Sequence, residues 1–346
     1  MRPDGLPRLA ITMGDPAGIG PEIVLKALIH PEVYDTCLPT VFGDLEWMQR
    51  TARLLRLEQQ VVAVETGNAP NESTVLVQQA TQVDLRNVRV GHLAAAAGQA
   101  AAECVLAAAK AAMAGATDAL VTAPLNKEAI ALGGYPYPGH TELLAEVTHT
   151  PRYGMLLLAG PLRVVHVSTH VSLREAIARV QTPRILECIR LGDRACRDLG
   201  IAAPRIAVAG LNPHAGENGL FGTEETEQIA PAVVMARQEG IEATGPHPPD
   251  TVFQRAAAGA FDLVVAMYHD QGHIPVKLHG FDSGVNVTIG LPIQRVSVDH
   301  GTAFDIAGQG IAREQSLLEA IRVAVLLVTA SRTRTRDSNF DQGVLR

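Results

Sequence analysis

The sequence contains few aromatic residues and few cysteines. Phe, Trp and Tyr together make up 4% of its 346 residues, which leaves no platform of rings on which single-stranded nucleic acid would stack. The four cysteines, Cys37, Cys104, Cys188 and Cys196, have no C-x-x-C spacing. This pattern argues against a disulfide framework or a structural zinc site and fits a reducing compartment.

The chain is also expected to have no signal sequence and no membrane span, and it has no excess of positive charge. Its N-terminus has no apolar core of the signal-peptide type, and the most apolar long stretch, residues 93–114, is interrupted by Gln99, Glu103 and Lys110. We therefore predict a cytoplasmic protein in which this stretch forms a buried amphipathic helix. The net charge of −7 and the pI of about 5.9 predict no binding to nucleic acid or to membrane surfaces.

Strand-like and helix-like segments alternate along the chain, which predicts an α/β protein with a parallel sheet covered on both faces. The expected strands are 9–13 and 118–122, and the expected helices are 21–28, 141–148, 185–199, 226–238 and 316–329. Residues 153–165 have the pattern of a hairpin, so a mixed sheet is expected. The polar tail 331–339 is expected to be frayed. The length indicates two domains, with the Gly- and Pro-rich segment 133–138 as the candidate hinge.

A glycine-rich turn, Gly14-Asp15-Pro16-Ala17-Gly18-Ile19-Gly20-Pro21-Glu22, follows the first expected strand. Its glycines let the backbone approach a ligand closely, and the helix start at Pro21 could hold an anion. A tight turn without a ligand explains the same residues equally well. The turn has neither the G-x-G-x-x-G spacing of a Rossmann fingerprint nor the Gly-Lys-Ser/Thr of a P-loop.

Three short apolar runs each lead into a histidine among small or polar residues. The runs are 164–170, 206–217 and 263–272, and they deliver His170, His214 and His269. Ligands bind at the carboxyl ends of parallel strands, so three imidazoles there predict a divalent metal site. A single such histidine is more often a hydrogen-bonded structural residue, and His166 ranks below His170 because it lies mid-strand.

Two further segments carry groups suited to a small anionic substrate. Residues 137–142 open a helix with His140 and Thr141, and Lys277, Asn286 and Arg295 interrupt an otherwise apolar stretch. Lysine and arginine beside apolar strands favour a carboxylate or phosphate ligand. Taken singly, each of these residues is as well explained as a solvated polar group at the edge of a strand.

Seven longer motifs extend over almost the whole chain. They are GDPAGIGPE (14–22), PGHTELL (138–144), STH (168–170), GLNPHAGE (210–217), AMYHDQG (266–272), GVNVTIGLP (284–292) and SVDHGTAFDIAG (297–308). Through them the chain resembles the 4-hydroxythreonine-4-phosphate dehydrogenase family from Thr12 to about Ala312. The two terminal motifs are also similar to those of isocitrate and isopropylmalate dehydrogenases, whose two-domain α/β/α fold binds a nicotinamide cofactor without a Rossmann fingerprint.

The resemblance implies a domain plan and a role for each candidate residue. Residues 1–134 and 308–346 would form one domain, and 135–307 a second that carries the metal ligands and the dimer interface. The implied metal ligands are His170, His214 and His269, with one of the three from the partner subunit of a homodimer; the ion is Zn, Mg, Co or Mn. The implied substrate-binding residues are His140, Thr141, Lys277, Asn286 and Arg295. The implied NAD loop is His300, Gly301, Thr302 and Ala303, and the candidate catalytic bases are His140 and Lys277.

The resemblance also implies oxidation and decarboxylation of a 4-phosphorylated 3-hydroxy acid with NAD. The segments 168–177 and 269–275 are more similar to the sugar-acid branch, which converts D-threonate or D-erythronate 4-phosphate to dihydroxyacetone phosphate and carbon dioxide in carbohydrate metabolism. The alternative is 4-phosphooxy-L-threonine dehydrogenase of pyridoxine biosynthesis. From another class, a metal-dependent hydrolase would use the same three histidines to activate water.

Overall fold

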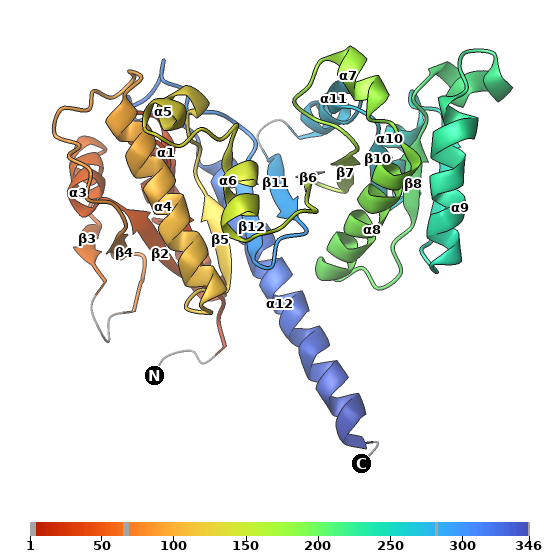
Figure 1. Cartoon of the computed structure of the whole chain (residues 1–346). Helices are drawn as coiled ribbons and strands as arrows, with labels where there is room; N and C mark the ends of the chain where they lie inside the picture. Colours follow the sequence, from red (N-terminus) through yellow and green to blue (C-terminus); the bar gives the residue numbers. More distant parts are fainter. Residues whose placement is uncertain (1–4, 65–68, 281–282, 345–346) are drawn as a thin grey trace. The chain divides into compact units, whose positions relative to one another are not determined.

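The computed structural model describes residues 5–64, 69–280 and 283–344. Its contacts divide these residues into two units, and each unit contains six strands. Unit 1 contains the described residues up to Pro151 and those from Leu291 onward, and unit 2 is Arg152–Gly290. Figure 1 shows strands flanked by helices in both units, which is the α/β architecture that the alternating sequence pattern predicts.

The border between the units differs in position from the border expected from sequence, which was 134/135 and 307/308. Segment 133–138 lies inside unit 1, where it connects two helices. The physical reason is that the following helix buries Leu143 and Leu144 in the same apolar cluster as Ala10 and Leu120. Packing of this helix keeps the chain in unit 1 as far as Pro151.

Unit 1 contains parallel strands, and the central ones are buried on both faces. Its strands are β1 (Arg8–Thr12), β2 (Leu38–Gly43), β3 (Gln60–Ala63), β4 (Thr74–Gln79), β5 (Ala119–Thr122) and β12 (Gln294–Val298). Their order is β3-β4-β2-β1-β5-β12, and each neighbouring pair is parallel. Near-continuous apolar runs such as Leu9-Ala10-Ile11 suit this position, because helices cover both faces of a parallel sheet.

The helices of unit 1 form two layers. They are α1 (Gly20–Ala27), α2 (Pro31–Thr36), α3 (Leu45–Leu54), α4 (Ala95–Met113), α5 (Lys127–Leu132), α6 (His140–Val147) and α12 (Gln315–Val344). Helix α4 packs with α5, α6 and the strands β1 and β2, whereas α1 packs with α3 and α12. The predicted buried helix over 93–114 is confirmed as α4, whose alanine face is fully buried. Gly98 is required there, since a Cβ at this position would lie 1.9 Å from the carbonyl oxygen of Ala129.

Unit 2 has a mixed sheet. Its strands are β6 (Gly154–Ala159), β7 (Leu162–His166), β8 (Ile206–Ala209), β9 (Ala243–His247), β10 (Leu263–Ala266) and β11 (Val285–Ile289). Strands β6 and β7 pair antiparallel across the turn at residues 160–161, so the predicted hairpin is confirmed. Strand β11 is antiparallel to β6, whereas β7-β10-β8-β9 are parallel.

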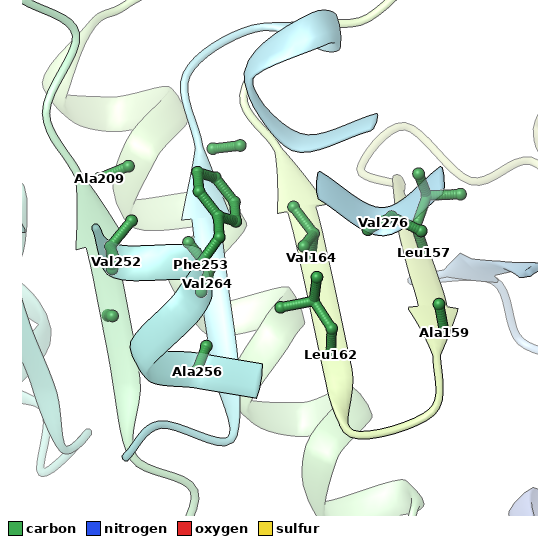
Figure 2. Close-up of a cluster of buried hydrophobic side chains, with 12 residues drawn as sticks. Leu157, Ala159, Leu162, Val164, Ala209, Val252, Phe253, Ala256, Val264 and Val276 are labelled. Carbon is green, nitrogen blue, oxygen red and sulfur yellow. The ribbon is translucent and has the colours of Figure 1, made fainter. Parts of the chain in front are cut away.

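The core of unit 2 lies between the sheet and two helices (Figure 2). Alternate residues of β6, β7, β8 and β10 face this cluster, as a period of two requires. The buried members are Leu157, Ala159, Leu162, Val164, Ala207, Ala209, Val252, Phe253, Ala256, Val264, Ala266 and Val276. This packing fixes the strands whose carboxyl ends carry the predicted metal ligands.

The helical segments of unit 2 are shorter and less regular. They are α7 (Leu173–Ala178), α8 (Thr182–Asp198), the 3-10 segment η1 (Pro213–Gly219), the π-turn η2 (Glu225–Ile229), α9 (Ala230–Gln238), α10 (Val252–Ala257) and α11 (His269–His279). The helix predicted over 226–238 therefore begins with a π-turn, a feature that its apolar spacing does not reveal.

The prediction of a frayed tail at 331–339 is wrong. Helix α12 continues to Val344, and Figure 1 shows it as one continuous helix. Arg332 explains the first part of the extension, because its guanidinium donates to Asp118 Oδ2 at 3.0 Å and to the carbonyl oxygen of Gly5. No helix among the described residues is long and apolar enough to cross a membrane.

Candidate functional site

The predicted metal ligands follow three strands of unit 2. Strand β7 ends at His166, four residues earlier than the predicted run, so His170 lies in the loop after the strand. His269 is the first residue of α11, after β10, and His214 lies in η1, after β8. His166, which was expected mid-strand, is instead the last residue of its strand.

Two of the predicted ligands lie together. The rings of His170 and His269 are 5.7 Å apart between centroids, and the Nδ1 of His269 donates to Asp270 Oδ1 at 2.7 Å. Such a carboxylate fixes the tautomer of a histidine and leaves Nε2 directed at a metal. Imidazole nitrogens are ligands that zinc and similar ions accept. The chemistry of this donor set therefore fits a divalent ion.

Two more histidines support His269 from behind. The ring of His273 stacks on that of His269 at 3.6 Å and 11°, and its Nδ1 lies 3.0 Å from the carbonyl oxygen of His269. His166 is buried, with its ring 4.7 Å from that of His273. Burial, followed by the neighbouring His273 and His269, lowers the pKa of His166. His273 therefore packs directly against the His269 ring, and the buried His166 packs against His273.

His214 occupies an unusual backbone segment. From His214 to Asn218 every residue has φ between 43° and 81°, so this turn is left-handed. That conformation costs roughly 1–2 kcal/mol for each residue with a Cβ, and such strain concentrates at functional sites. Among the described residues of this chain, no group of three His, Cys, Asp or Glu side chains has the geometry to hold a metal ion. The role of His214 as a ligand, and the partner subunit's contribution, stay predictions.

In unit 1 a buried arginine near the start of β12 contacts the last residue of β5. Arg295 on β12 is 2% exposed, and its Nε and Nη2 donate to Thr122 Oγ1 on β5 at 3.2 and 2.7 Å. Burial lowers the pKa of Arg295 to about 9, while Glu142 opposes that shift. The guanidinium is therefore still cationic at neutral pH and is held ready for an anion.

His140 and Thr141 begin α6 in the same unit and are half-buried. Burial, and secondarily the charge of Arg295, lower the pKa of His140, while a hydrogen bond to the backbone of Ala123 raises it. The Nε2 atom of His140 is shielded from solvent and has no hydrogen-bond partner among the described residues. His140 is thus a neutral imidazole with a nitrogen able to take a proton.

The glycine-rich turn packs on the predicted NAD loop. Ile19 N donates to the carbonyl oxygen of Thr302 at 3.0 Å, and a Cβ on Gly18 would lie 2.8 Å from the Cβ of Thr302. The amides of Ala17 and Gly18 both donate to Asp15. Because these amides are used within the protein, the structure favours the tight-turn interpretation. Pro21 stands in the first turn of α1, as predicted.

The predicted NAD loop is a short, irregular segment after β12. His300 and Gly301 are exposed, and Nδ1 of His300 lies 3.0 Å from the carbonyl oxygen of Gly301. Thr302 is buried, and Ala303 has a φ of 41°. His300 and Gly301 are therefore accessible to a ligand, while the buried Thr302 fixes the loop to the protein.

The remaining predicted substrate residues belong to unit 2. Lys277 is exposed on α11, and Asn286 is half-buried on β11. Each unit thus brings its own predicted residues together: His140, Thr141 and Arg295 in unit 1, and His170 and His269 in unit 2.

The sequence analysis missed three residues that support these groups. Thr122 holds Arg295, Asp270 holds His269, and the buried Glu225 contacts the turn that carries His214. Only Asp270 had a usable signal, because it directly follows a predicted ligand. Thr122 and Glu225 lie 173 and 11 positions from the residues that they support, so no local motif contains them.

Comparison with known proteins identifies the family. The model of the family described as "Pyridoxal phosphate biosynthetic protein PdxA" matches residues 35–324. D-threonate 4-phosphate dehydrogenase of Cupriavidus necator is 49% identical over 94% of this chain and 98% of its own. 4-Hydroxythreonine-4-phosphate dehydrogenase of Desulforapulum autotrophicum is 46% identical over 94% and 97%.

A solved structure gives the same result. It is 4-hydroxythreonine-4-phosphate dehydrogenase from Klebsiella pneumoniae, which is 46% identical and covers 93% of this chain and 99% of that chain, with a TM-score of 0.86. These relatives are named dehydrogenases, so the chain is an oxidoreductase of that type. On this likeness over nearly its whole length, the chain belongs to the PdxA family.

Proposed function

We propose that the protein is an NAD-dependent, divalent-metal-dependent dehydrogenase that oxidises and decarboxylates a 4-phosphorylated 3-hydroxy acid. The proposed substrate is D-threonate or D-erythronate 4-phosphate, and the products are dihydroxyacetone phosphate and carbon dioxide. The observation that carries the proposal is the 49% identity to a protein named D-threonate 4-phosphate dehydrogenase, over 94% of this chain. The 46% identity to a 4-hydroxythreonine-4-phosphate dehydrogenase supports 4-phosphooxy-L-threonine as the second candidate.

The candidate residues divide between substrate binding and proton transfer. Arg295, cationic and fully buried, neutralises a carboxylate or phosphate of the substrate, and Lys277, Asn286 and Thr141 add polar contacts. A charged partner in a site with little water gains much more than it would at the surface. His140, neutral with a shielded Nε2, takes the proton of the reacting hydroxyl. Lys277 is the other candidate base, and its exposure makes it the weaker one.

The cofactors complete this set. When bound, a divalent ion held by His170, His214 and His269 would polarise the oxygen at the reacting carbon, and NAD at His300–Ala303 would accept the hydride. Asp270 and His273 orient the His269 ring toward that ion. We further propose a cytoplasmic homodimer in which one subunit lends one of the three histidines to the other.

A side-by-side assay tests the substrate. D-threonate 4-phosphate, D-erythronate 4-phosphate and 4-phosphooxy-L-threonine are each supplied with NAD, and NADH formation and carbon dioxide release are recorded. We expect the highest kcat/KM with one of the two sugar acids. A preference for 4-phosphooxy-L-threonine would select the second candidate, and turnover that needs no NAD would select a hydrolase instead.

A histidine variant tests the metal site. His214→Ala should retain the fold by circular dichroism but lose bound metal in elemental analysis, whereas His279→Ala, at an exposed histidine of the same unit, should retain it. Full metal content in the His214 variant would reject the ligand assignment.

A further inference from the structure

The left-handed turn at residues 214–218 needs an explanation of its own. Four of its five residues carry a Cβ, and such a run is unfavourable without support from elsewhere. Short-range backbone bonds of the turn are few: Ala215 N donates to Asn212 O at 3.1 Å, and Leu220 N and Phe221 N donate to Glu217 O and Gly216 O, each at 3.2 Å. The support must come from a neighbouring element.

That support is the carboxylate of Glu225, the first residue of the π-turn η2. It is 2% exposed, although a buried carboxylate is stable only when its oxygens are hydrogen-bonded. Oε1 accepts from Leu211 N at 2.8 Å and from Asn212 N at 2.7 Å, and Oε2 accepts from Asn212 Nδ2 at 2.9 Å. These bonds fix the two residues that lead into the turn.

Two glycines let the carboxylate come this close. A Cβ on Gly216 would lie 2.8 Å from Glu225 Oε2, and a Cβ on Gly210 would lie 2.8 Å from the Cα of Ala215. Both glycines belong to the GLNPHAGE motif, but Glu225 lies beyond it. The GLNPHAGE motif therefore packs closely against the Glu225 carboxylate, although the two are separated in the sequence.

We propose that Glu225 is a positioning residue: its buried carboxylate holds the left-handed turn 214–218 and thereby sets the direction of the His214 side chain. This inference rests on the proposed role of His214 as a metal ligand. The π-turn has a function in this arrangement, because it places the Glu225 side chain toward Leu211 and Asn212 rather than along the regular face of α9. Replacing an outer-shell group that orients a metal ligand typically lowers metal affinity roughly 10–100-fold, and Glu225 would act in this way through Leu211 and Asn212.

The variant that tests this is Glu225→Gln, which keeps the side-chain volume. One amide oxygen can still accept from Leu211 and Asn212, but the amide NH₂ then faces Asn212 Nδ2, so that two donors oppose each other. Glu227→Gln is the matched control, because it removes the same charge from an exposed position of the π-turn η2. Glu224→Gln is a graded variant: it replaces a charge-assisted 2.7 Å bond from Asn212 Nδ2 by a weaker bond to a neutral amide oxygen, and it leaves the backbone bonds to Glu225 intact.

Two measurements are made on the full chain. Hydrogen exchange of the metal-free protein should be about tenfold or more faster in peptides covering 210–218 of the Glu225 variant, and unchanged in α8 and β10. Zn²⁺ affinity, titrated against a competing chelator, should fall roughly 10–100-fold. The Glu224 variant, which keeps the backbone bonds and so the fold, should show a smaller change of the same sign, and the Glu227 variant none.

The outcomes separate the two ideas. If His214→Ala loses its metal while Glu225→Gln keeps wild-type exchange and affinity, the positioning role is rejected and the metal site stands. If Glu225→Gln exchanges faster but both variants keep full Zn²⁺ affinity, His214 is no ligand and the functional part of the inference is rejected with it. Uniformly faster exchange over unit 2 would show a general loss of packing and would also reject it.

Discussion

The buried pair of Arg295 and Thr122 gives the sharpest test of the site in unit 1. Both side chains are essentially inaccessible to solvent, and two nitrogens of the guanidinium share one hydroxyl oxygen, at 2.7 and 3.2 Å. Thr122→Val keeps the shape of the side chain but removes this acceptor. The cation then stays buried with two donors directed at a methyl group.

The cost can be worked out from this geometry. A hydrogen bond to a charged group contributes about 1.5–3 kcal/mol, and an unsatisfied buried donor adds to its loss. Arg295 has further interactions that the substitution leaves in place, so we expect a loss of about 2 kcal/mol in the free energy of unfolding, or roughly a 30-fold change in the unfolding equilibrium. Urea unfolding of the ligand-free protein, followed by circular dichroism, measures it.

The chain provides its own control on the adjacent strand. Thr12 on β1 is directly paired with Thr122 in the register of β1 and β5, and it is equally buried. Its hydroxyl, however, has no hydrogen-bond partner among the described residues. Thr12→Val should therefore be neutral or stabilising, because it removes an unsatisfied polar group. Equal losses in the two variants would refute the reasoning, since they would reflect strand packing rather than the bond to Arg295.

Three further predictions concern neighbouring groups. Burial raises the pKa of Asp15 from 3.8 to about 6, so the free energy of unfolding should fall by up to ~3 kcal/mol as the pH rises from about 4 to about 6. Asp15→Asn should remove this decrease, measured by urea unfolding at several pH values, and an unchanged pH dependence would contradict the prediction. Gly18→Ala should raise the KM for NAD about tenfold or more with little effect on the KM for substrate, because its Cβ would displace Thr302. An equal increase in the two KM values would indicate a general loss of structure and contradict the prediction. Asp270→Asn should lower Zn²⁺ affinity about tenfold by releasing the Nδ1 of His269, and wild-type affinity would show that this carboxylate is dispensable.

Much of the fold could be predicted because its signals are local. The apolar runs of β1 and β5, Pro21 at the start of α1, and the turn between β6 and β7 all depend on residues within one element. The π-turn before α9 could not be predicted, since its apolar spacing is also that of an α-helix. The continuation of α12 likewise depends on Arg332 reaching Asp118, 214 positions away.

The candidate site was likewise predictable only where its signals are local. Residues that would touch a ligand, such as His170, His269 and Arg295, lie in motifs that a reader of the sequence can find. How each is held could not be found, because Thr122 is one buried threonine among several in strands and Glu225 is one of several glutamates in its segment. What distinguishes Thr122 from Thr12 is the bond to Arg295, and that bond exists only in the folded chain.

In both units, a hydrogen bond from another element holds a candidate site residue or the segment that carries it. Thr122, the last residue of β5, accepts from Arg295 in unit 1, and Glu225 accepts from the segment leading to His214 in unit 2. A side chain held in this way does not lose its conformational freedom again when a ligand arrives, so more of the binding energy remains for the reaction. Substitution of such a partner should therefore reduce function more than stability. Thr122→Val and Glu225→Gln, compared with Thr12→Val and Glu227→Gln, test that expectation once in each unit.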